Sequence, residues 1–379
     1  MKTVKISRRA LLHQLGGGAT LAVVPRLSVT TLTEESITRQ TGGPLRLNRN
    51  ESACGPSARA IAAMREAAEE GANRYPEAES EALQNKLAEF HGVRPAQIVL
   101  GCGSNEILRI AVAAFGGSGR KVVVASPTFE LVGQCARHAG ADVVTVPLAK
   151  NYSHDLDAML AEVDGRTGLV YICNPNNPTG SVTPRSDLES FIKRLPSTTY
   201  VLVDEAYHHY VGGSSDYASF IDRPVVENPK LIVTRSFSGV YGLAGMRVGY
   251  AIAEPDTAQT IASHRLPDSL TSVAARAAIA ALGDLDHVRA AVAANADGRQ
   301  EFFNQANARM LRAIDSHTNF VMFDTQHEGS DVVEHCKSQG VLISGPFANF
   351  GRFVRVSLGT SDNMREFWRV WDMKYGHMM

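Results

Sequence analysis

The sequence has few cysteines and almost no excess of charge of either sign. Its five cysteines are scattered and no two of them form a C-x-x-C pair, so neither a disulfide framework nor a zinc site is expected. The 38 basic and 39 acidic side chains give a formal net charge of −1, which argues against a nucleic-acid surface or an acidic interaction tail. The composition therefore indicates a protein that works on small molecules, with no metal and no nucleic-acid partner.

A long apolar run is also missing, and this bears on the N-terminus. Two early lysines precede the run Ser7-Arg8-Arg9-Ala10-Leu11-Leu12, and a mildly apolar stretch follows as far as Val24. A charged start before a short apolar run is typical of an export signal, and the paired arginines resemble a twin-arginine signal. The run is too short for a stable membrane anchor. Residues 1–30 therefore predict a periplasmic or exported protein, the alternative being a basic leader on a cytoplasmic one.

The middle of the chain alternates between strand-like and helix-like patterns. Residues 31–55 predict an extended polar arm, and helical patterns follow from Ser57 to Glu70 and from Glu79 to Phe90. The β-rich runs are Ile98–Leu100, Val122–Ala125, Val143–Val146, Leu169–Cys173, Val201–Asp204, Leu231–Thr234 and Val248–Ile252. Helix-length segments separate most of them, which is typical of an α/β domain with a mainly parallel sheet buried on both faces.

The pattern changes after about Leu270. A long helical stretch is followed by short strands near Phe320–Phe323, Val341–Ile343 and Phe353–Ser357. At 379 residues and 44% apolar content the chain can form two cores. We therefore predict a large α/β domain over residues 56–270, with a mainly parallel seven-stranded sheet, and a smaller α+β domain over residues 271–379.

Glycines and polar residues follow several of these strands, at the edge where open α/β sheets bind ligands. The run Gly101-Cys102-Gly103-Ser104-Asn105 precedes a helix that Ser104 could cap and whose free N–H groups would face an anion. It lacks the third glycine of a dinucleotide fingerprint, which argues against a nicotinamide dehydrogenase. Phe129 lies beyond the next strand, where a cofactor ring could stack on it. Each feature alone also fits an ordinary turn or core residue.

Three later runs carry more specific polar groups. Asn177 stands in the proline-rich run Asn174–Gly180, which could hold its amide rigidly. Asp204 ends a buried strand, and a buried carboxylate needs a cationic partner such as a protonated pyridine nitrogen, a metal or a basic side chain. Ser236 and Arg247 can offer a hydroxyl and a guanidinium to a phosphate.

Together these segments resemble, in order and spacing, the fold-type I aminotransferases that use pyridoxal 5′-phosphate, and most closely the histidinol-phosphate aminotransferase branch. The resemblance runs from about Leu47 to about Thr360. It implies an aspartate aminotransferase-like fold and amino-group transfer from an amino acid to a 2-oxo acid. The implied cofactor contacts are Asp204 at the pyridine nitrogen, Tyr207 and Asn177 at the phenolic oxygen, Phe129 on the ring, and Ser104, Asn105, Ser236 and Arg247 at the phosphate.

The resemblance also implies substrate and partner contacts. Tyr75 corresponds to a tyrosine that reaches the phosphate of the partner subunit, which implies a homodimer. Arg355, with Asn177, corresponds to the groups that bind the substrate, the arginine at its α-carboxylate. The family's N-terminal arm over the site is matched by three residues, Asn48, Asn50 and Glu51.

One position departs from the family at the centre of its chemistry. The family has Ser-Lys where this chain has Ser238-Gly239, eight residues before Arg247. That lysine forms the Schiff base with the cofactor and moves the α-proton of the substrate. The nearest lysine in sequence, Lys230, starts the preceding strand and should face away. Loss of a positioned acid–base group usually lowers the rate by about 10²–10⁴-fold.

The sequence leaves three interpretations of Gly239 open. The protein could run altered chemistry with Tyr207, Tyr241, His208 or a free amine as proton carrier. It could bind the cofactor without turnover. The lysine could also have been removed deliberately.

A second departure concerns the substrate. In the histidinol-phosphate enzymes an arginine that holds the substrate phosphate follows the small-domain strand, whereas here Val341-Leu342-Ile343 is followed by Ser344. With Arg355 retained, the sequence predicts a free amino acid as substrate.

Overall fold

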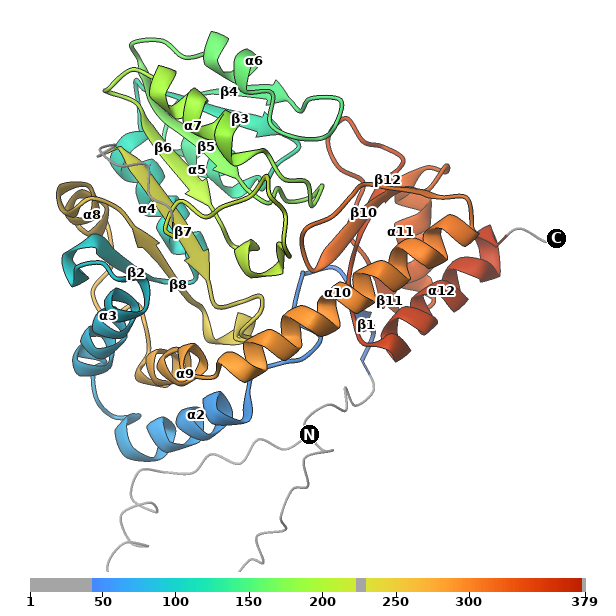
Figure 1. Ribbon diagram of the computed structural model, residues 1–379, viewed down its shortest axis with the longest axis horizontal. Helices are drawn as coiled ribbons and strands as arrows, with labels where there is room; N and C mark the ends of the chain where they lie inside the picture. The colour runs from blue at the N-terminus through green and yellow to red at the C-terminus, as the bar shows by residue number, and fades with distance from the viewer. Residues whose placement is uncertain (1–42, 223–229, 377–379) are drawn as a thin grey trace, which may run out of the picture. The chain divides into compact units, whose positions relative to one another are not determined.

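A seven-stranded sheet forms the core of the structure, a computed structural model that describes residues 43–222 and 230–376 (Figure 1). In sheet order its strands are β2 (Ile98–Cys102), β8 (Val248–Ile252), β7 (Leu231–Ser236), β6 (Tyr200–Asp204), β5 (Thr167–Cys173), β3 (Lys121–Ser126) and β4 (Asp142–Pro147). Strand β8 is antiparallel to both of its neighbours and the remaining pairs are parallel. The predicted α/β fold with a mainly parallel seven-stranded sheet is confirmed.

Alternation along the strands gives the sheet two buried faces. In β6, Val201 and Val203 belong to one apolar cluster and Leu202 to the other, because successive side chains of a strand point to opposite faces. The first face is covered by α2 (Ala58–Gly71), α3 (Glu77–His91), α6 (Leu156–Ala161), α7 (Arg185–Arg194) and α9 (Ser272–Leu282). The second is covered by α4 (Ser104–Phe115), α5 (Leu131–His138) and α8 (Pro255–Ala262).

The C-terminal residues have an apolar core of their own. The long helix α10 (Leu285–Ala308) leads into it (Figure 1). Its other elements are β9 (Arg312–Ala313), β10 (Phe320–Asp324), α11 (Gly329–Ser338), β11 (Val341–Leu342), β12 (Phe353–Ser357) and α12 (Ser361–Tyr375). Strands β12, β10 and β9 form an antiparallel sheet in that order. The apolar side chains of α12 pack there, among them the fully buried Trp371.

Part of the predicted N-terminal arm is a strand. β1 (Leu45–Arg46) pairs in parallel with β11, and Leu47 is buried in the C-terminal core. The arm is therefore attached to the C-terminal elements. The predicted signal, residues 1–30, and the first part of the arm, residues 31–42, lie outside the described residues.

The predicted division at residue 270 remains a prediction. From Pro44 onward the chain forms one compact unit, and α9, which lies after that boundary, packs into the core of the large sheet. Three short 3-10 helices complete the secondary structure of the described chain: η2 (Pro95–Gln97), η3 (His208–Tyr210) and η4 (Ala244–Met246).

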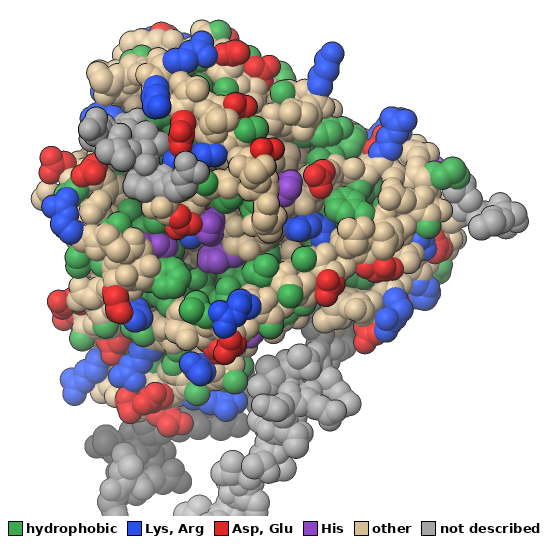
Figure 2. All heavy atoms as spheres, in the orientation of Figure 1, with side chains coloured by type: hydrophobic (Ala, Val, Ile, Leu, Met, Phe, Trp, Pro, Cys, Tyr) green, Lys and Arg blue, Asp and Glu red, His purple; other side chains and the backbone are tan. Residues whose placement is uncertain are grey.

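The surface carries charge of both signs in mixture. On the face shown in Figure 2, basic and acidic side chains are interspersed and neither sign forms a continuous field. Within the described residues, none of the helices has the length and apolar character needed to cross a membrane.

Candidate active site

The predicted site residues follow strands that lie side by side in the sheet. Strands β5, β6 and β7 are parallel neighbours, and Cys173, Asp204 and Thr234 occupy one row across their carboxyl ends. Asn177 follows β5 and Tyr207 follows β6. The sheet topology thus brings together residues that are far apart in sequence, at the edge where such sheets bind ligands.

Asp204 is a buried carboxylate with neutral partners. It is 3% exposed, and its oxygens accept hydrogen bonds from Tyr171 Oη at 3.1 Å, Ala206 N at 3.1 Å and Thr234 Oγ1 at 3.2 Å. No basic side chain of the described chain lies within ion-pair distance of it. Burial raises the pKa of Asp204 to about 6. Such a carboxylate fits a cationic ligand atom, as the predicted pyridinium nitrogen would be.

Tyr207 and Asn177 are joined to the arm and to Arg355. The Tyr207 hydroxyl accepts hydrogen bonds from Asn50 Nδ2 at 2.9 Å and from Asn177 Nδ2 at 3.3 Å. The amide oxygen of Asn177 accepts a hydrogen bond from Arg355 Nη1. Burial raises the pKa of Tyr207 to about 12, so its phenol is neutral at physiological pH. This network links the arm, the large sheet and β12.

Arg355 is a buried cation beside the arm. It is 9% exposed, its Nη2 donates to Asn48 O at 3.0 Å and to Ser344 Oγ at 3.1 Å, and its Nε has no hydrogen-bond partner within residues 43–222 and 230–376. No carboxylate of the described chain lies within ion-pair distance of it. Burial lowers the pKa of Arg355, and an incoming carboxylate would compensate its desolvation.

The start of α4 forms a small concave site with Arg247, called here the phosphate cup, whose groups suit a phosphate. The Arg247 guanidinium lies against Gly103, where an added Cβ would be 2.0 Å from Nη2. Its Nη1 donates to Ala244 O at 3.0 Å and to Ser238 Oγ at 3.3 Å. Gly249 leaves room for the backbone of Ser104, since a Cβ there would be 2.2 Å from the Ser104 nitrogen. A guanidinium, hydroxyls and an uncapped helix N-terminus are donors that suit a phosphate.

The predicted capping role of Ser104 is wrong. Gly103 is the N-cap, with φ +75°, and Ser104 is the first helical residue and makes no capping hydrogen bond. Only glycine fits the N-cap position, because of its positive φ and the nearby Arg247. Ser104 is buried and Asn105 is exposed in the first turn of the helix. Ser236, at the end of β7, accepts a hydrogen bond from Ser238 N at 3.0 Å.

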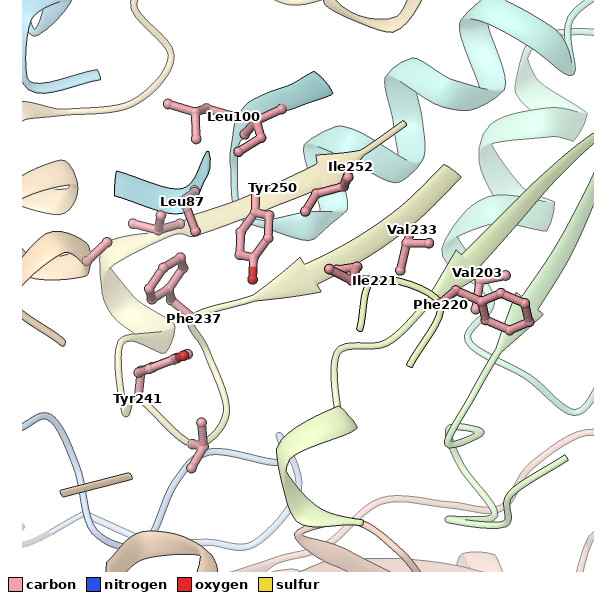
Figure 3. Close-up of a cluster of buried hydrophobic side chains, with 14 of the residues drawn as sticks. Leu87, Leu100, Val203, Phe220, Ile221, Val233, Phe237, Tyr241, Tyr250 and Ile252 are labelled. Carbon is pink, nitrogen blue, oxygen red and sulfur yellow. The ribbon is translucent and has the colours of Figure 1, made fainter. Parts of the chain in front are cut away.

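The loop that carries Gly239 is fixed by its buried neighbours. Figure 3 shows Phe237 and Tyr241 beside Tyr250 of β8. The ring centroids of Phe237 lie 4.8 Å from those of Tyr241 and 5.9 Å from those of Tyr250. A Cβ at Gly239 would make ordinary contacts, the nearest being Tyr210 Cε2 at 3.4 Å. The backbone at this position therefore accommodates a side chain.

Two predicted cofactor contacts, Phe129 and Tyr75, lie outside this hydrogen-bond network. Phe129 is half-buried beyond β3 and packs against the second-face cluster. Tyr75 is 79% exposed between α2 and α3. Two of the alternative proton carriers are engaged elsewhere, because Tyr241 Oη lies 3.3 Å from His209 Nε2 and His208 Nδ1 lies 3.1 Å from Tyr217 Oη.

Lys230 donates to Tyr200 Oη at 2.9 Å, at the end of the sheet opposite to the network. Both residues stand at the amino ends of their strands. This agrees with the expectation that Lys230 faces away from the site.

Sequence reasoning missed three residues that contact the site network. Tyr171 and Thr234 bind Asp204, and Ser238 binds Arg247. Tyr171 and Thr234 could have been noticed as hydroxyl side chains within apolar strands, since a buried hydroxyl needs a hydrogen-bond partner. The sequence pattern does not indicate which residue that partner is.

Known proteins match the chain over most of its length. A family model described as aminotransferase class I and II matches residues 43–370. Histidinol-phosphate aminotransferase of Moorella thermoacetica is 33% identical over 339 residues, covering 89% of this chain and 87% of that protein. Histidinol-phosphate aminotransferase 2 of Ralstonia nicotianae is 39% identical over 321 residues, covering 83% and 84%.

A solved structure shows the same relationship. Histidinol-phosphate aminotransferase from Sinorhizobium meliloti, in complex with pyridoxal-5′-phosphate, has a TM-score of 0.81 and 30% identity, over 92% of this chain and 97% of that one. These matches confirm the predicted family and its pyridoxal-phosphate-dependent transaminase type. The chain therefore belongs to the class I and II aminotransferases.

Proposed function

We propose that the protein binds pyridoxal phosphate and a free amino acid at this site, for amino-group transfer to a 2-oxo acid. One observation carries the proposal: two buried side chains of opposite charge, Asp204 and Arg355, have no charged partner among the residues that the structure describes, and both act electrostatically on Tyr207. Buried charges are retained in proteins when a ligand compensates them. A pyridinium for Asp204 and an α-carboxylate for Arg355 would do so.

Pyridoxal phosphate supplies a carbonyl that takes up an amino group and a ring that accepts electrons from the α-carbon. The chain's own residues bind and orient. Asp204 would keep the ring nitrogen protonated, while Tyr207 and Asn177 would donate hydrogen bonds to the phenolic oxygen. Phe129 would pack on the ring. The phosphate would be held by the α4 N-terminus, with Ser104 and Asn105, and by Ser236 and Arg247.

Gly239 is proposed to stand where the family has its lysine. The buried Phe237 and Tyr241 support this placement, since they fix the loop on either side of Gly239. Without an amine at this position the family's proton carrier is missing, and turnover should be lower than in family members by about 10²–10⁴-fold or more. The missing side chain also favours a second candidate function, binding of the cofactor and the amino acid without turnover.

A free amino acid is the proposed substrate class. Ser344, which stands where the histidinol-phosphate enzymes have an arginine, binds Arg355 and the arm carbonyl of Asn48. The site therefore offers one guanidinium from this strand pair, which suits a carboxylate of single charge. A phosphate of about two negative charges would be less well compensated.

Two proposals concern the assembly and the location. A homodimer is supported by Tyr75, whose 79% exposed ring resembles the tyrosine that reaches the partner's cofactor in the family. Export is supported by the arginine pair, Arg8 and Arg9, before the apolar run.

Equilibrium titration with pyridoxal phosphate tests the cofactor proposal. We expect saturable binding that Asp204→Ala weakens by about 30-fold or more, because the ring's cation would lose its buried partner. Absence of binding by the wild-type protein would overturn the proposal. Release of a 2-oxo acid from added amino acids then separates the two candidates: spectral change with release supports transfer, and spectral change without release supports binding alone.

A further inference from the structure

Tyr171 is a fully buried tyrosine within a parallel strand. It lies in β5 at 0% exposure, and its hydroxyl donates to Asp204 Oδ2 across the β5–β6 pair at 3.1 Å. Tyr171 and Cys173 point to the same face of the sheet, and Cys173 is directly opposite Asp204 in the register. The tyrosine therefore approaches the carboxylate from the interior of the sheet, on the side away from the open carboxyl edge.

The two oxygens of Asp204 are held differently. Oδ1 accepts two hydrogen bonds, from Ala206 N and Thr234 Oγ1. Oδ2 accepts one, from Tyr171, within the described chain. Donors on both oxygens fix the carboxylate plane. Without Tyr171, Oδ2 would be a buried acceptor with no partner, and the carboxylate could rotate about its last bond.

The surroundings keep Tyr171 a donor. Burial raises the pKa of Tyr171 well above its usual range, so the phenol is neutral at physiological pH. Its hydrogen bond lowers the pKa of Asp204, against desolvation and the nearby Glu205. Glu205 is itself paired with Arg235 at 3.0 Å. The other titratable groups near the carboxylate, the Cys173 thiol and the Tyr207 phenol, are neutral because burial raises the pKa of each.

We propose that Tyr171 is a positioning residue, which holds the Asp204 carboxylate so that it faces the ring nitrogen of the cofactor. The proposal rests on the cofactor role proposed for Asp204. In this proposal the site includes a residue of the sheet interior that would contact Asp204 and not the ligand. Tyr171 would influence cofactor binding only by setting the orientation and the ionisation of the Asp204 carboxylate.

Tyr171→Phe removes one oxygen atom, and Tyr250→Phe is the matched control. Tyr250 is also buried, in β8 (Figure 3), and its hydroxyl bonds His91 Nε2 at 2.9 Å, outside the Asp204 network. The first measurement needs no cofactor: the pKa of Asp204 is followed by NMR of protein labelled with ¹³C at the aspartate carboxyl carbons, with Asp204→Asn to assign the signal. Tyr171→Phe should raise this pKa above that measured for the wild-type protein, whereas Tyr250→Phe should leave it unchanged.

The second measurement is titration with pyridoxal phosphate at several pH values. Tyr171→Phe should raise the dissociation constant about tenfold, the usual effect of one hydrogen bond to a charged group. The pH at which binding weakens should move upward with the Asp204 pKa. Neither change is expected in Tyr250→Phe. If Tyr171→Phe does not fold, NMR of the wild-type protein provides the test. A slowly exchanging Tyr171 hydroxyl proton, whose signal shifts as Asp204 titrates, supports the hydrogen bond to Asp204. Absence of such a signal overturns the proposed contact.

The outcomes separate this inference from the proposed function. If wild-type protein binds pyridoxal phosphate and Asp204→Asn weakens binding, but Tyr171→Phe behaves like Tyr250→Phe, the positioning role is wrong and the cofactor proposal stands. If Asp204→Asn has no effect on binding, the cofactor role of Asp204 is wrong, and the role of Tyr171 falls with it.

Discussion

Ser344 and Arg355 are joined by three hydrogen bonds. Their backbones form an antiparallel bridge, with N···O distances of 3.0 and 2.7 Å, and Arg355 Nη2 donates to Ser344 Oγ at 3.1 Å. Directly opposed residues share one face of a strand pair. The serine hydroxyl in turn donates a hydrogen bond to Asn48 O at 2.8 Å. The guanidinium is thus fixed before any ligand arrives, which reduces the entropy lost on binding.

Ser344→Ala should weaken amino-acid binding. Removing the hydroxyl takes away one of the two hydrogen bonds that Arg355 Nη2 donates, so the dissociation constant of an amino acid should rise about tenfold, while pyridoxal phosphate binding stays unchanged. Spectral titration of cofactor-loaded protein measures both. Ser338→Ala, at an exposed hydroxyl that donates to His335 O, is the matched control. Tighter binding of histidinol phosphate than of free amino acids by the wild-type protein would refute the substrate proposal.

Gly239→Lys should form a covalent link to the cofactor, on the proposal that Gly239 stands at the family's lysine position. The nearest contact of an added Cβ is 3.4 Å, from Tyr210 Cε2, so the backbone should accept the side chain. We expect a yellow protein whose pH-dependent absorption band is abolished by borohydride. Gly245→Lys adds a lysine to the same segment at an exposed glycine with no atom within 4 Å of its Cβ, and should stay colourless. A folded but colourless Gly239→Lys protein would mean that the lysine position is elsewhere.

The stability of the cofactor-free protein should depend on Asp204 between about pH 4 and pH 6. The folded carboxyl, with its pKa raised to about 6, keeps its proton in this window, whereas the unfolded one has lost it. Its contribution is therefore full below pH 4 and falls as pH rises, by up to about 3 kcal/mol. Urea unfolding at several pH values should show that Asp204→Asn lacks this fall.

The buried histidines are present in both the wild-type and the Asp204→Asn protein, so their contribution to the pH dependence of stability cancels in this comparison. An identical slope of stability against pH in both proteins would contradict the raised pKa of Asp204. Added pyridoxal phosphate should reverse the trend, because the ionised carboxylate is the form that pairs with a pyridinium.

Gly103→Ala should disrupt the phosphate cup. A Cβ at residue 103 would overlap Arg247 Nη2, and the guanidinium would have to move. Gly119→Ala introduces the same kind of positive φ, +78° against +75°, with no atom within 4 Å of the Cβ. Both variants should lose about 1–3 kcal/mol of stability from backbone strain. Only Gly103→Ala should lose its preference for pyridoxal phosphate over pyridoxal, and equal preference in both variants would argue against this cup.

Replacement of Arg8 and Arg9 by lysine should retain the protein in the cytoplasm, because the twin-arginine route recognises the guanidinium pair and not charge alone. Fractionation of cells that express the intact chain measures this. The urea midpoint should be unchanged, since every site residue comes later in the chain. Wild-type protein found wholly in the cytoplasm with an uncleaved N-terminus would favour the basic leader instead.

The sequence by itself determined the elements, their order and the family. Every strand predicted for the large sheet is present, because buried parallel strands need continuous apolar runs such as Val201–Val203, and these are visible without coordinates. Asp204, Asn177 and Tyr207 could be singled out for a similar reason, since each stands within a few residues after the end of such a run. The arm was predicted only as extended, because two residues, Leu45–Arg46, become a strand solely through pairing with β11.

Only the tertiary structure decided which side chains meet. The hydroxyl of Tyr171 faces Asp204 from the neighbouring strand, 33 residues away in the chain, and Ser344 meets both Arg355 and Asn48. The N-cap of α4 is Gly103 and not Ser104, and Arg247, from a distant loop, lies against this glycine. Local sequence patterns indicate which residues are buried and where strands end. Register and strand order determine the partners of a buried polar group, and these depend on contacts between segments far apart in the chain.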